Sequence, residues 1–143
     1  MVAAPRYLKQ NPRIDDPGDL AKHQIITMAH LPNSWTFPPV AGSSVPRIVQ
    51  VTPRLVTNSI RGAAASAVGG RGVALFFSFQ VAEAVRNGEL EVVLAGHEPA
   101  ALPVHVIVPQ GRLTVPKVRA FMDFAVPRLR SHFARLEKDS SSY

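Results

Sequence analysis

The sequence contains no cysteine among its 143 residues. Disulfides and thiolate metal sites are therefore excluded, which agrees with a reducing compartment. The sequence also lacks any run of about 20 apolar residues, the length that a membrane-spanning helix needs. Its start, MVAAPRYLKQNPR, has no apolar segment typical of a secretory signal. We therefore expect a cytoplasmic protein that has no membrane partner.

Aromatic residues are scarce, at 7% of the chain, and acidic residues are outnumbered. Sixteen lysines and arginines against ten acids give a formal charge of +6, so nucleic acid and anionic ligands both have to be considered as partners. The cations are scattered, however, and no aromatic residues are interleaved with them as stacking platforms. This pattern favours a solvated surface over a nucleic-acid groove.

Clusters of catalytic or metal-ligating residues are also missing from the sequence. The five histidines are widely spaced, and none has a second histidine or a carboxylate at metal-site spacing. Ser43 and Ser44 lie in a predicted loop without a nucleophile-elbow motif. Asp15 and Asp16 are adjacent, which suits a helix cap better than paired acid and base chemistry. We expect no enzyme activity, no metal and no cofactor.

The sequence does have alternating helical and strand-like segments, which predict an α/β sheet with crossover helices. Pro53 is expected to break the strand predicted over 47–57 or to place it at a sheet edge. Asp15 or Asp16 is expected to cap a short helix over 15–23. The remaining predictions are strands over 24–30, 35–37, 72–77 and 89–96, and helices over 59–70 and 78–88.

The C-terminal part predicts one more strand and one amphipathic helix. Residues 103–109, PVHVIVP, predict the strand, and apolar residues at three- and four-residue spacing predict the helix over 115–136. We expect this helix to pack on the sheet, and we expect Pro127 to kink or split it, because an interior proline costs about 3 kcal/mol. Residues 137–143 are predicted to be a polar tail.

A cluster of three glycines and an arginine, within SAVGGRGVALFF at 66–77, raises the question of a phosphate loop. Such loops follow a strand and precede a helix, because the anion binds the free N–H groups at the helix N-terminus. Here the order is reversed, since 63–68 predict a helix and 73–77 a strand. Gly69 or Gly70 is therefore expected to end a helix in the left-handed conformation. We expect no ligand at the glycines themselves.

Polar residues that follow two predicted strands are better ligand candidates. Asn58 and Ser59 follow the strand-like RLVT, and Ser78 lies between Phe77 and Phe79 after the next strand. In α/β sheets, ligands collect outside the carboxyl ends of strands. We therefore expect Asn58, Ser59 and Ser78 to contact an anion or a polar ligand. The alternative is that they only cap helices.

The order of these segments resembles the effector-binding domain of LysR-type transcriptional regulators over almost the whole chain. Residues 1–26 resemble the strand, P-x-Y-L helix and P-x-D-L segment of that family, and SWTF resembles its tryptophan-centred hairpin. PRLVTNS resembles its strand into a capped helix, and AVGGRGVALFFSFQVAEAVRNGELEVVL resembles the helix, strand and helix that follow. PKVRAFMDF is the most specific single match.

The resemblance implies an α/β fold of the periplasmic-binding-protein type (type 2), with three layers and a mixed sheet. Residues 1–102 are expected to form the second of two lobes, and 103–143 to supply a strand and helix of the first lobe. A full regulator also has an N-terminal winged helix-turn-helix and the remainder of the first lobe, and we expect both to be missing from this chain. Contact with DNA would then depend on a domain outside this sequence.

The resemblance also implies a small-molecule effector, expected to be anionic, in the cleft between the lobes. Helix N-termini would favour its carboxylate, and Trp35 and Phe77 would form apolar walls. The residues predicted to bind the effector are Pro32, Asn33, Ser34, Trp35, Asn58, Ser59, Phe77 and Ser78.

The predicted function is ligand sensing for a transcriptional regulator. The apolar stripe of the last helix further predicts a homo-oligomer, because exposed apolar area recruits partners. Two alternatives stay open: a stand-alone module for anion or small-molecule binding and oligomerisation without a role in DNA binding, and a small α/β enzyme.

Overall fold

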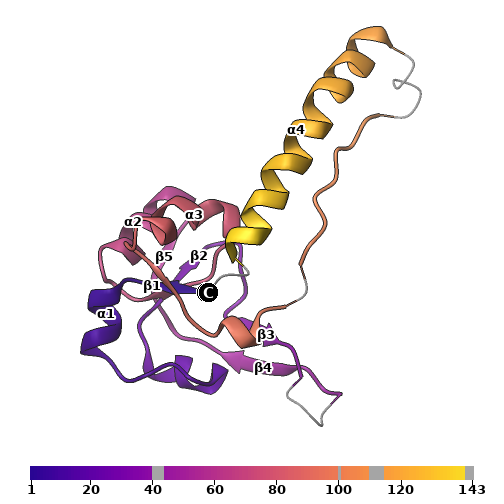
Figure 1. The fold of residues 1–143 in the computed structure, drawn as a ribbon. Helices are drawn as coiled ribbons and strands as arrows, with labels where there is room; N and C mark the ends of the chain where they lie inside the picture. Colours follow the sequence, from indigo (N-terminus) through magenta and orange to yellow (C-terminus); the bar gives the residue numbers. More distant parts are fainter. Residues whose placement is uncertain (40–43, 100, 110–114, 141–143) are drawn as a thin grey trace. The chain divides into compact units, whose positions relative to one another are not determined.

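Five strands form one mixed sheet in the computed structural model, in the order β5-β2-β6-β1-β7 (Figure 1). The structure describes residues 1–39, 44–99, 101–109 and 115–140. β2 (Ile25–Met28) pairs in parallel with β5 (Pro53–Thr57) and β6 (Val73–Ala74). β1 (Val2–Ala3) pairs antiparallel with β6 and with β7 (Glu91–Val92). The predicted α/β sheet is confirmed, and Pro53 begins its edge strand.

The sheet belongs to the first of two compact units, unit 1 (Met1–Pro99) and unit 2 (Ala100–Tyr143). In unit 1, helices α2 (Ile60–Val68) and α3 (Ser78–Arg86) cover one face of the sheet (Figure 1). The small side chains of Ala63 and Ala67 let α2 approach the strands closely, and both are fully buried there against residues such as Ile26.

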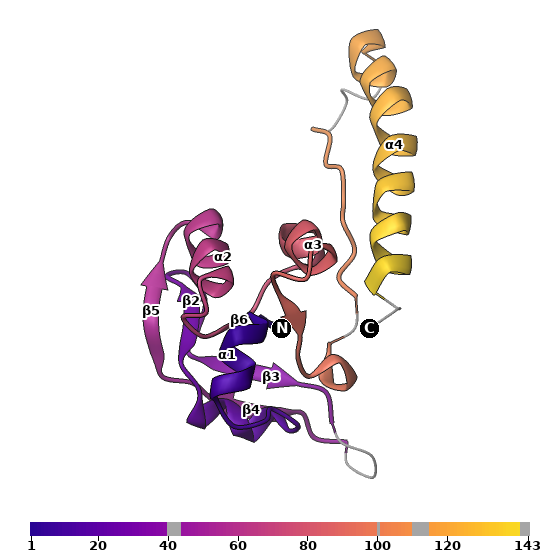
Figure 2. The same ribbon diagram turned by 60° about the vertical axis from the view of Figure 1, so that its left-hand side comes forward.

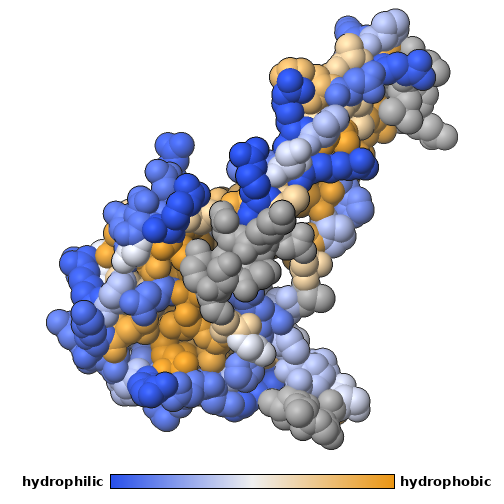
Figure 3. Space-filling view, viewed as in Figure 1, coloured by the Kyte–Doolittle hydropathy of each residue, from blue (hydrophilic) through white to orange (hydrophobic). Residues whose placement is uncertain are grey.

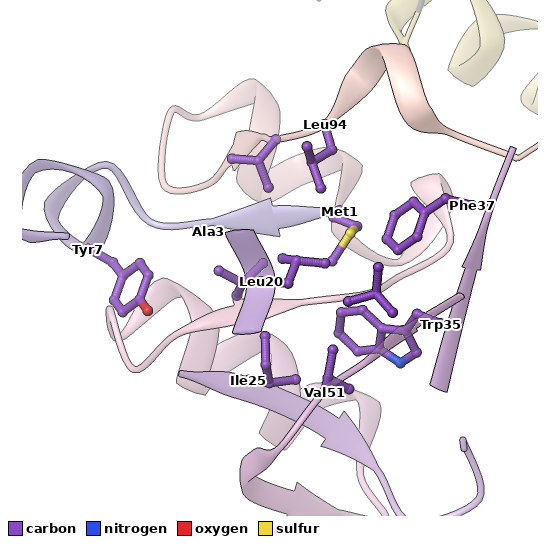
Figure 4. Packing of buried hydrophobic residues seen from close by; sticks show 12 residues of the cluster. Met1, Ala3, Tyr7, Leu20, Ile25, Trp35, Phe37, Val51 and Leu94 are labelled. Carbon is purple, nitrogen blue, oxygen red and sulfur yellow. The ribbon is translucent and has the colours of Figure 1, made fainter. Parts of the chain in front are cut away.

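The other face of this sheet is covered by shorter elements. They are α1 (Pro5–Gln10), the 3₁₀ helix η1 (Pro17–Lys22) and a hairpin of β3 (Ser34–Phe37) with β4 (Arg47–Gln50). Their apolar side chains form what we call the hairpin-side core (Figure 4). Its buried members are Met1, Ala3, Tyr7, Leu20, Ile25, Trp35, Phe37, Val49, Val51, Val73, Val93 and Leu94. Unit 1 therefore has the predicted three layers.

The short helix η1 begins at the predicted cap. The Asp16 side chain accepts from the Gly18 N–H at 2.8 Å, and the Asp19 side chain accepts from the Asp16 N–H at 3.1 Å. This is a capping box, which satisfies two N–H groups that a helix start leaves free. Arg47 of β4 also binds Asp16, and this hydrogen bond holds the pKa of Asp16 below its usual value. The contact ties the hairpin to η1.

The glycine cluster ends α2, as predicted. Gly70 has a φ of +68°, its N–H donates to the Ala67 carbonyl at 2.8 Å, and the Arg71 N–H donates to the Ser66 carbonyl at 3.0 Å. These bonds close the last turn of the helix in the manner of a Schellman motif. The cluster therefore ends α2 and shapes the entry into β6.

Unit 2 corrects the prediction of a strand over 103–109. Residues 101–109 form no strand, and most of their side chains are exposed, Ile107 at 88%. The apolar alternation is present, but an isolated strand cannot satisfy its backbone N–H and C=O groups without a partner. Val106 to Pro109 instead line an apolar groove of about 260 Å³ with Val118, Phe121 and Met122.

The C-terminal helix, α4 (Pro116–Ser140), is not split at Pro127, because a helix of 25 residues retains enough hydrogen bonds to tolerate the loss of one. A kink at Pro127 stays a prediction. The helix extends over 137–140 of the predicted polar tail, and 141–143 lie outside the described residues. Hydrophobic and hydrophilic residues both reach the surface of unit 2 (Figure 3). Packing of this helix on the sheet stays a prediction.

A buried histidine links α1 to the start of β2. The Gln24 N–H donates to the Tyr7 hydroxyl at 2.9 Å, and this hydroxyl lies 3.1 Å from His23 Nδ1. In the neutral ring with its proton on Nε2, Nδ1 accepts the hydroxyl proton of Tyr7. Burial lowers the pKa of His23; the nearby Asp19 raises it and Lys22 lowers it further.

We expect unit 1 to lose stability as the pH falls below about 6.5, the usual pKa of an unfolded histidine. The folded pKa is depressed, so the unfolded chain takes up the proton first, and stability that is complete above pH 6.5 declines towards the folded pKa. One proton can contribute at most about 1.4 kcal/mol per pH unit. Urea unfolding followed by tryptophan fluorescence between pH 7.5 and 5 measures the slope. The variant His23→Gln should reduce the slope of the free energy of unfolding against pH. An unchanged slope would mean that other titratable groups cause it.

Candidate functional site

The carboxyl ends of β5, β2 and β6 meet at one edge of the sheet, because these strands are parallel (Figure 2). Three segments follow them: residues 29–34 after β2, 58–59 after β5 and 75–78 after β6. We call these segments the carboxyl edge. The first segment is bonded to the end of β5, just before the second segment, since the Ala29 N–H donates to the Thr57 carbonyl at 2.9 Å. All predicted ligand residues except Trp35 lie in this edge.

The start of α2 places Asn58 and Ser59 differently. Ser59 is the cap: its Oγ accepts from the Gly62 N–H at 3.1 Å. The Ser59 N–H donates to Thr57 Oγ1, also at 3.1 Å. Asn58 precedes the cap, and its side chain is exposed at the end of β5. The Asn58 amide is therefore accessible to a ligand, whereas the Ser59 hydroxyl already bonds to the helix.

The start of α3 corrects the prediction that Ser78 caps it. Phe77 occupies the cap position, and its N–H donates to Gln80 Oε1 at 3.0 Å, while Ser78 is the first helical residue. Gln80 stabilises this start, because a glutamine three residues after the cap can bond back to the cap N–H. Phe77 is 54% exposed, and its ring stacks on Phe79 with centroids 5.8 Å apart.

The segment after β2 contains the other predicted ligand residues. Pro32 and Asn33 are exposed, Ser34 is half-buried, and the Asn33 carbonyl accepts from the Val51 N–H at 2.8 Å. Trp35, which follows, is only 5% exposed and lies in the hairpin-side core. Its part in a ligand wall stays a prediction.

The charges at the carboxyl edge favour an anion over a cation. Neither α2 nor α3 has an acidic residue in its first turn, and α2 has the exposed Arg61 there. Helix N-termini carry partial positive charge. His30, also exposed, lies in the segment after β2. This arrangement can bind a polar or anionic group.

Two features are absent from the part of the chain that the structure describes. No three histidine or acidic side chains come close enough together there to hold a metal ion. Across the same residues, no helix combines the length and apolar character that spanning a bilayer requires.

Two threonines near this edge were not singled out by the sequence analysis. Thr57 Oγ1 accepts from the Ser59 N–H at the start of α2. In the sequence, the signal for this contact is a threonine two residues before the cap serine. Thr27 is a buried polar residue in the apolar run of β2. Its signal was the one hydroxyl within the sequence IITM.

Residues 1–130 match the family model described as the LysR substrate binding domain. The HTH-type transcriptional regulator PtxR of Pseudomonas aeruginosa is 31% identical over 136 residues, which are 94% of this chain and 41% of PtxR. An HTH-type transcriptional regulator of Xanthomonas campestris pv. campestris is 28% identical over 132 residues, 90% of this chain and 38% of that protein. The chain thus spans about two fifths of these regulators.

Solved structures share the fold. The regulatory domain of CrgA, a LysR-type transcriptional regulator from Neisseria meningitidis, has a TM-score of 0.63 and 19% identity, over 86% of this chain and 60% of that one. The family match confirms the predicted periplasmic-binding-protein-like fold, and a family of binding domains agrees with the prediction that the chain is not an enzyme. The chain belongs to the family of LysR substrate binding domains.

Proposed function

We propose that this chain is the effector-binding part of a LysR-type transcriptional regulator and binds a small anionic metabolite at the carboxyl edge, in a cleft between two lobes. The observation that carries the proposal is the convergence of three segments, 29–34, 58–59 and 75–78, on one sheet edge whose helix starts lack acids. The names of its relatives support the regulatory role.

We further propose that the regulator is a cytoplasmic homo-oligomer whose contact with DNA lies outside residues 1–143. The exposed apolar residues of unit 2, among them Ile107 and Phe121, support the oligomer, because apolar area of this kind recruits partners.

Asn58→Asp should separate ligand binding from stability. The new carboxylate lies at the N-terminus of α2, where it should stabilise the helix by about 0.3–1 kcal/mol. The same charge should repel an anionic ligand and weaken its binding about tenfold, because two like charges within a few ångströms repel by about 1–4 kcal/mol near a protein surface. Calorimetric titration with a panel of monocarboxylates, each paired with its neutral amide, measures the effect.

Gln10→Glu is the matched control, because it adds the same charge on the exposed end of α1, outside the carboxyl edge. It should leave carboxylate binding unchanged. If the amides bind as tightly as the acids, the anionic class is wrong. If Asn58→Asp binds carboxylates as the unchanged chain does, the site lies elsewhere.

A further inference from the structure

Across the described residues, three buried side-chain atoms have no hydrogen-bond partner: His23 Nε2, Thr27 Oγ1 and Trp35 Nε1. The other ring nitrogen of His23 contacts the Tyr7 hydroxyl, whereas Thr27, at 4% exposed, and Trp35, at 5% exposed, have no side-chain partner at all. A buried donor or acceptor left unpaired shifts the folding equilibrium by about tenfold against the folded state. Such groups are rare in native proteins, and each calls for an explanation.

These two side chains lie on the same face of the sheet, just inside the carboxyl edge. Thr27 is the next-to-last residue of β2 and shares a face with Ile25, because alternate residues of a strand point the same way. Trp35 is the second residue of β3 and lies with Ile25 in the hairpin-side core. Residues 29–33 join the two strands. The indole nitrogen of Trp35 is turned away from Phe37 and Met1 (Figure 4).

We propose that Thr27 and Trp35 form a buried hydrogen-bonding subsite for a neutral acceptor oxygen of the effector, which enters beneath residues 29–34. The indole N–H can only donate and the threonine hydroxyl can also donate, so one oxygen can satisfy both groups. This inference rests on the proposed function, because it concerns the second polar group of the same ligand.

The apolar surroundings decide which oxygen this subsite takes. Ile25 and Val51 belong to the same buried cluster, and burying a charge costs far more than burying a neutral polar group. The carboxylate therefore stays at the carboxyl edge, near Asn58 and the start of α2, and a carbonyl or hydroxyl oxygen enters the subsite. The effector class is an oxo- or hydroxy-carboxylic acid with an apolar chain.

The variant Thr27→Val tests this proposal, because valine keeps the shape of threonine and removes the hydroxyl. In the ligand-free chain, the unfolding equilibrium constant should fall about fivefold, since one unpaired buried group is removed. The unchanged chain should bind oxo acids about tenfold more tightly than their deoxo analogues, with pairs such as 4-oxopentanoate and pentanoate as probes. Thr27→Val should lose most of this preference, and Thr27→Ser should keep it.

Nuclear magnetic resonance gives a direct readout of the second donor. Trp35 is the one tryptophan of the sequence, so its indole N–H gives a single assigned signal. That signal should move downfield when 4-oxopentanoate binds and should stay in place with pentanoate, which has no oxygen for the subsite.

Three outcomes would overturn the subsite. Loss of stability in ligand-free Thr27→Val would mean that the hydroxyl has a resident partner such as a bound water. An unchanged oxo preference in Thr27→Val, with carboxylate binding still weakened by Asn58→Asp, would reject the subsite and retain the proposed function. Absence of binding by every acid pair of four to seven carbons would reject both.

Discussion

Replacing Gly72 with alanine is expected to destabilise unit 1 by about 3–5 kcal/mol, a large part of the 5–15 kcal/mol that holds a typical domain folded. Gly72 has a φ of +152°, a conformation that side chains rarely adopt. A Cβ atom there would lie 2.2 Å from the Gln24 carbonyl oxygen. That oxygen accepts from the Val73 N–H at 2.8 Å. The clash would therefore push β6 away from β2 at the centre of the sheet.

Two other glycines separate backbone strain from collision. Gly88 has a φ of +71°, but a Cβ there would meet nothing within 4 Å, so Gly88→Ala should cost only about 1–2 kcal/mol. Gly96 has neither a positive φ nor a near neighbour, so Gly96→Ala should change the free energy of unfolding little. Urea unfolding followed by Trp35 fluorescence ranks the three variants. A cost for Gly72→Ala no larger than that for Gly88→Ala would show that the close approach to Gln24 does not matter.

Local signals in the sequence predicted local structure well. Asp16 before a proline identified the start of η1, and Pro53 identified the break before the edge strand, because each acts through the backbone within a few residues. Asn58 and Ser59 were both candidate caps, and in the structure Ser59 Oγ accepts from the Gly62 N–H. The glycine cluster was correctly assigned to a helix end because its order, helix before strand, is a local property.

Features that depend on distant partners were predicted less well. The apolar alternation of 103–109 predicts a strand, but a strand forms only where a second strand completes its hydrogen bonds. The sequence does not indicate which segment that partner would be. The cap of α3 lies one residue earlier than predicted, because Gln80 bonds back to the Phe77 N–H and so stabilises a helix start at Phe77. The unpaired Thr27 hydroxyl could be found only once the packing of β2 was known.

The carboxyl edge depends both on local sequence patterns and on the pairing of distant strands. Asn58 and Phe77 were selected as residues that follow strands, which is a local pattern, and the parallel pairing of β2 with its two neighbours then places them at one edge. Trp35 differs, since a tryptophan in a hairpin suits a ligand wall and a core equally well in sequence. Its burial in the hairpin-side core is a consequence of how β3 packs on the sheet.

Replacing Trp35 with alanine should therefore lower the free energy of unfolding by about 3–5 kcal/mol, because truncating a buried aromatic side chain leaves a cavity that the core refills only in part. Trp35 pairs with Val49 across the hairpin and joins it to the sheet through the hairpin-side core. Far-UV circular dichroism in urea measures the loss, since the variant has no tryptophan to report it.

Ile48→Ala is the matched control for Trp35→Ala. Ile48 lies in the same hairpin but is 64% exposed, so its truncation should cost less than about 0.5 kcal/mol. If Trp35→Ala also costs less than about 1 kcal/mol, the indole does not support the core. The reason for a tryptophan at this position would then be the ligand, which Trp35 would contact through the apolar wall or through the subsite. A large loss in Trp35→Ala and a small one in Ile48→Ala would instead show that the hairpin is held to the sheet by the side chain that also offers the indole N–H.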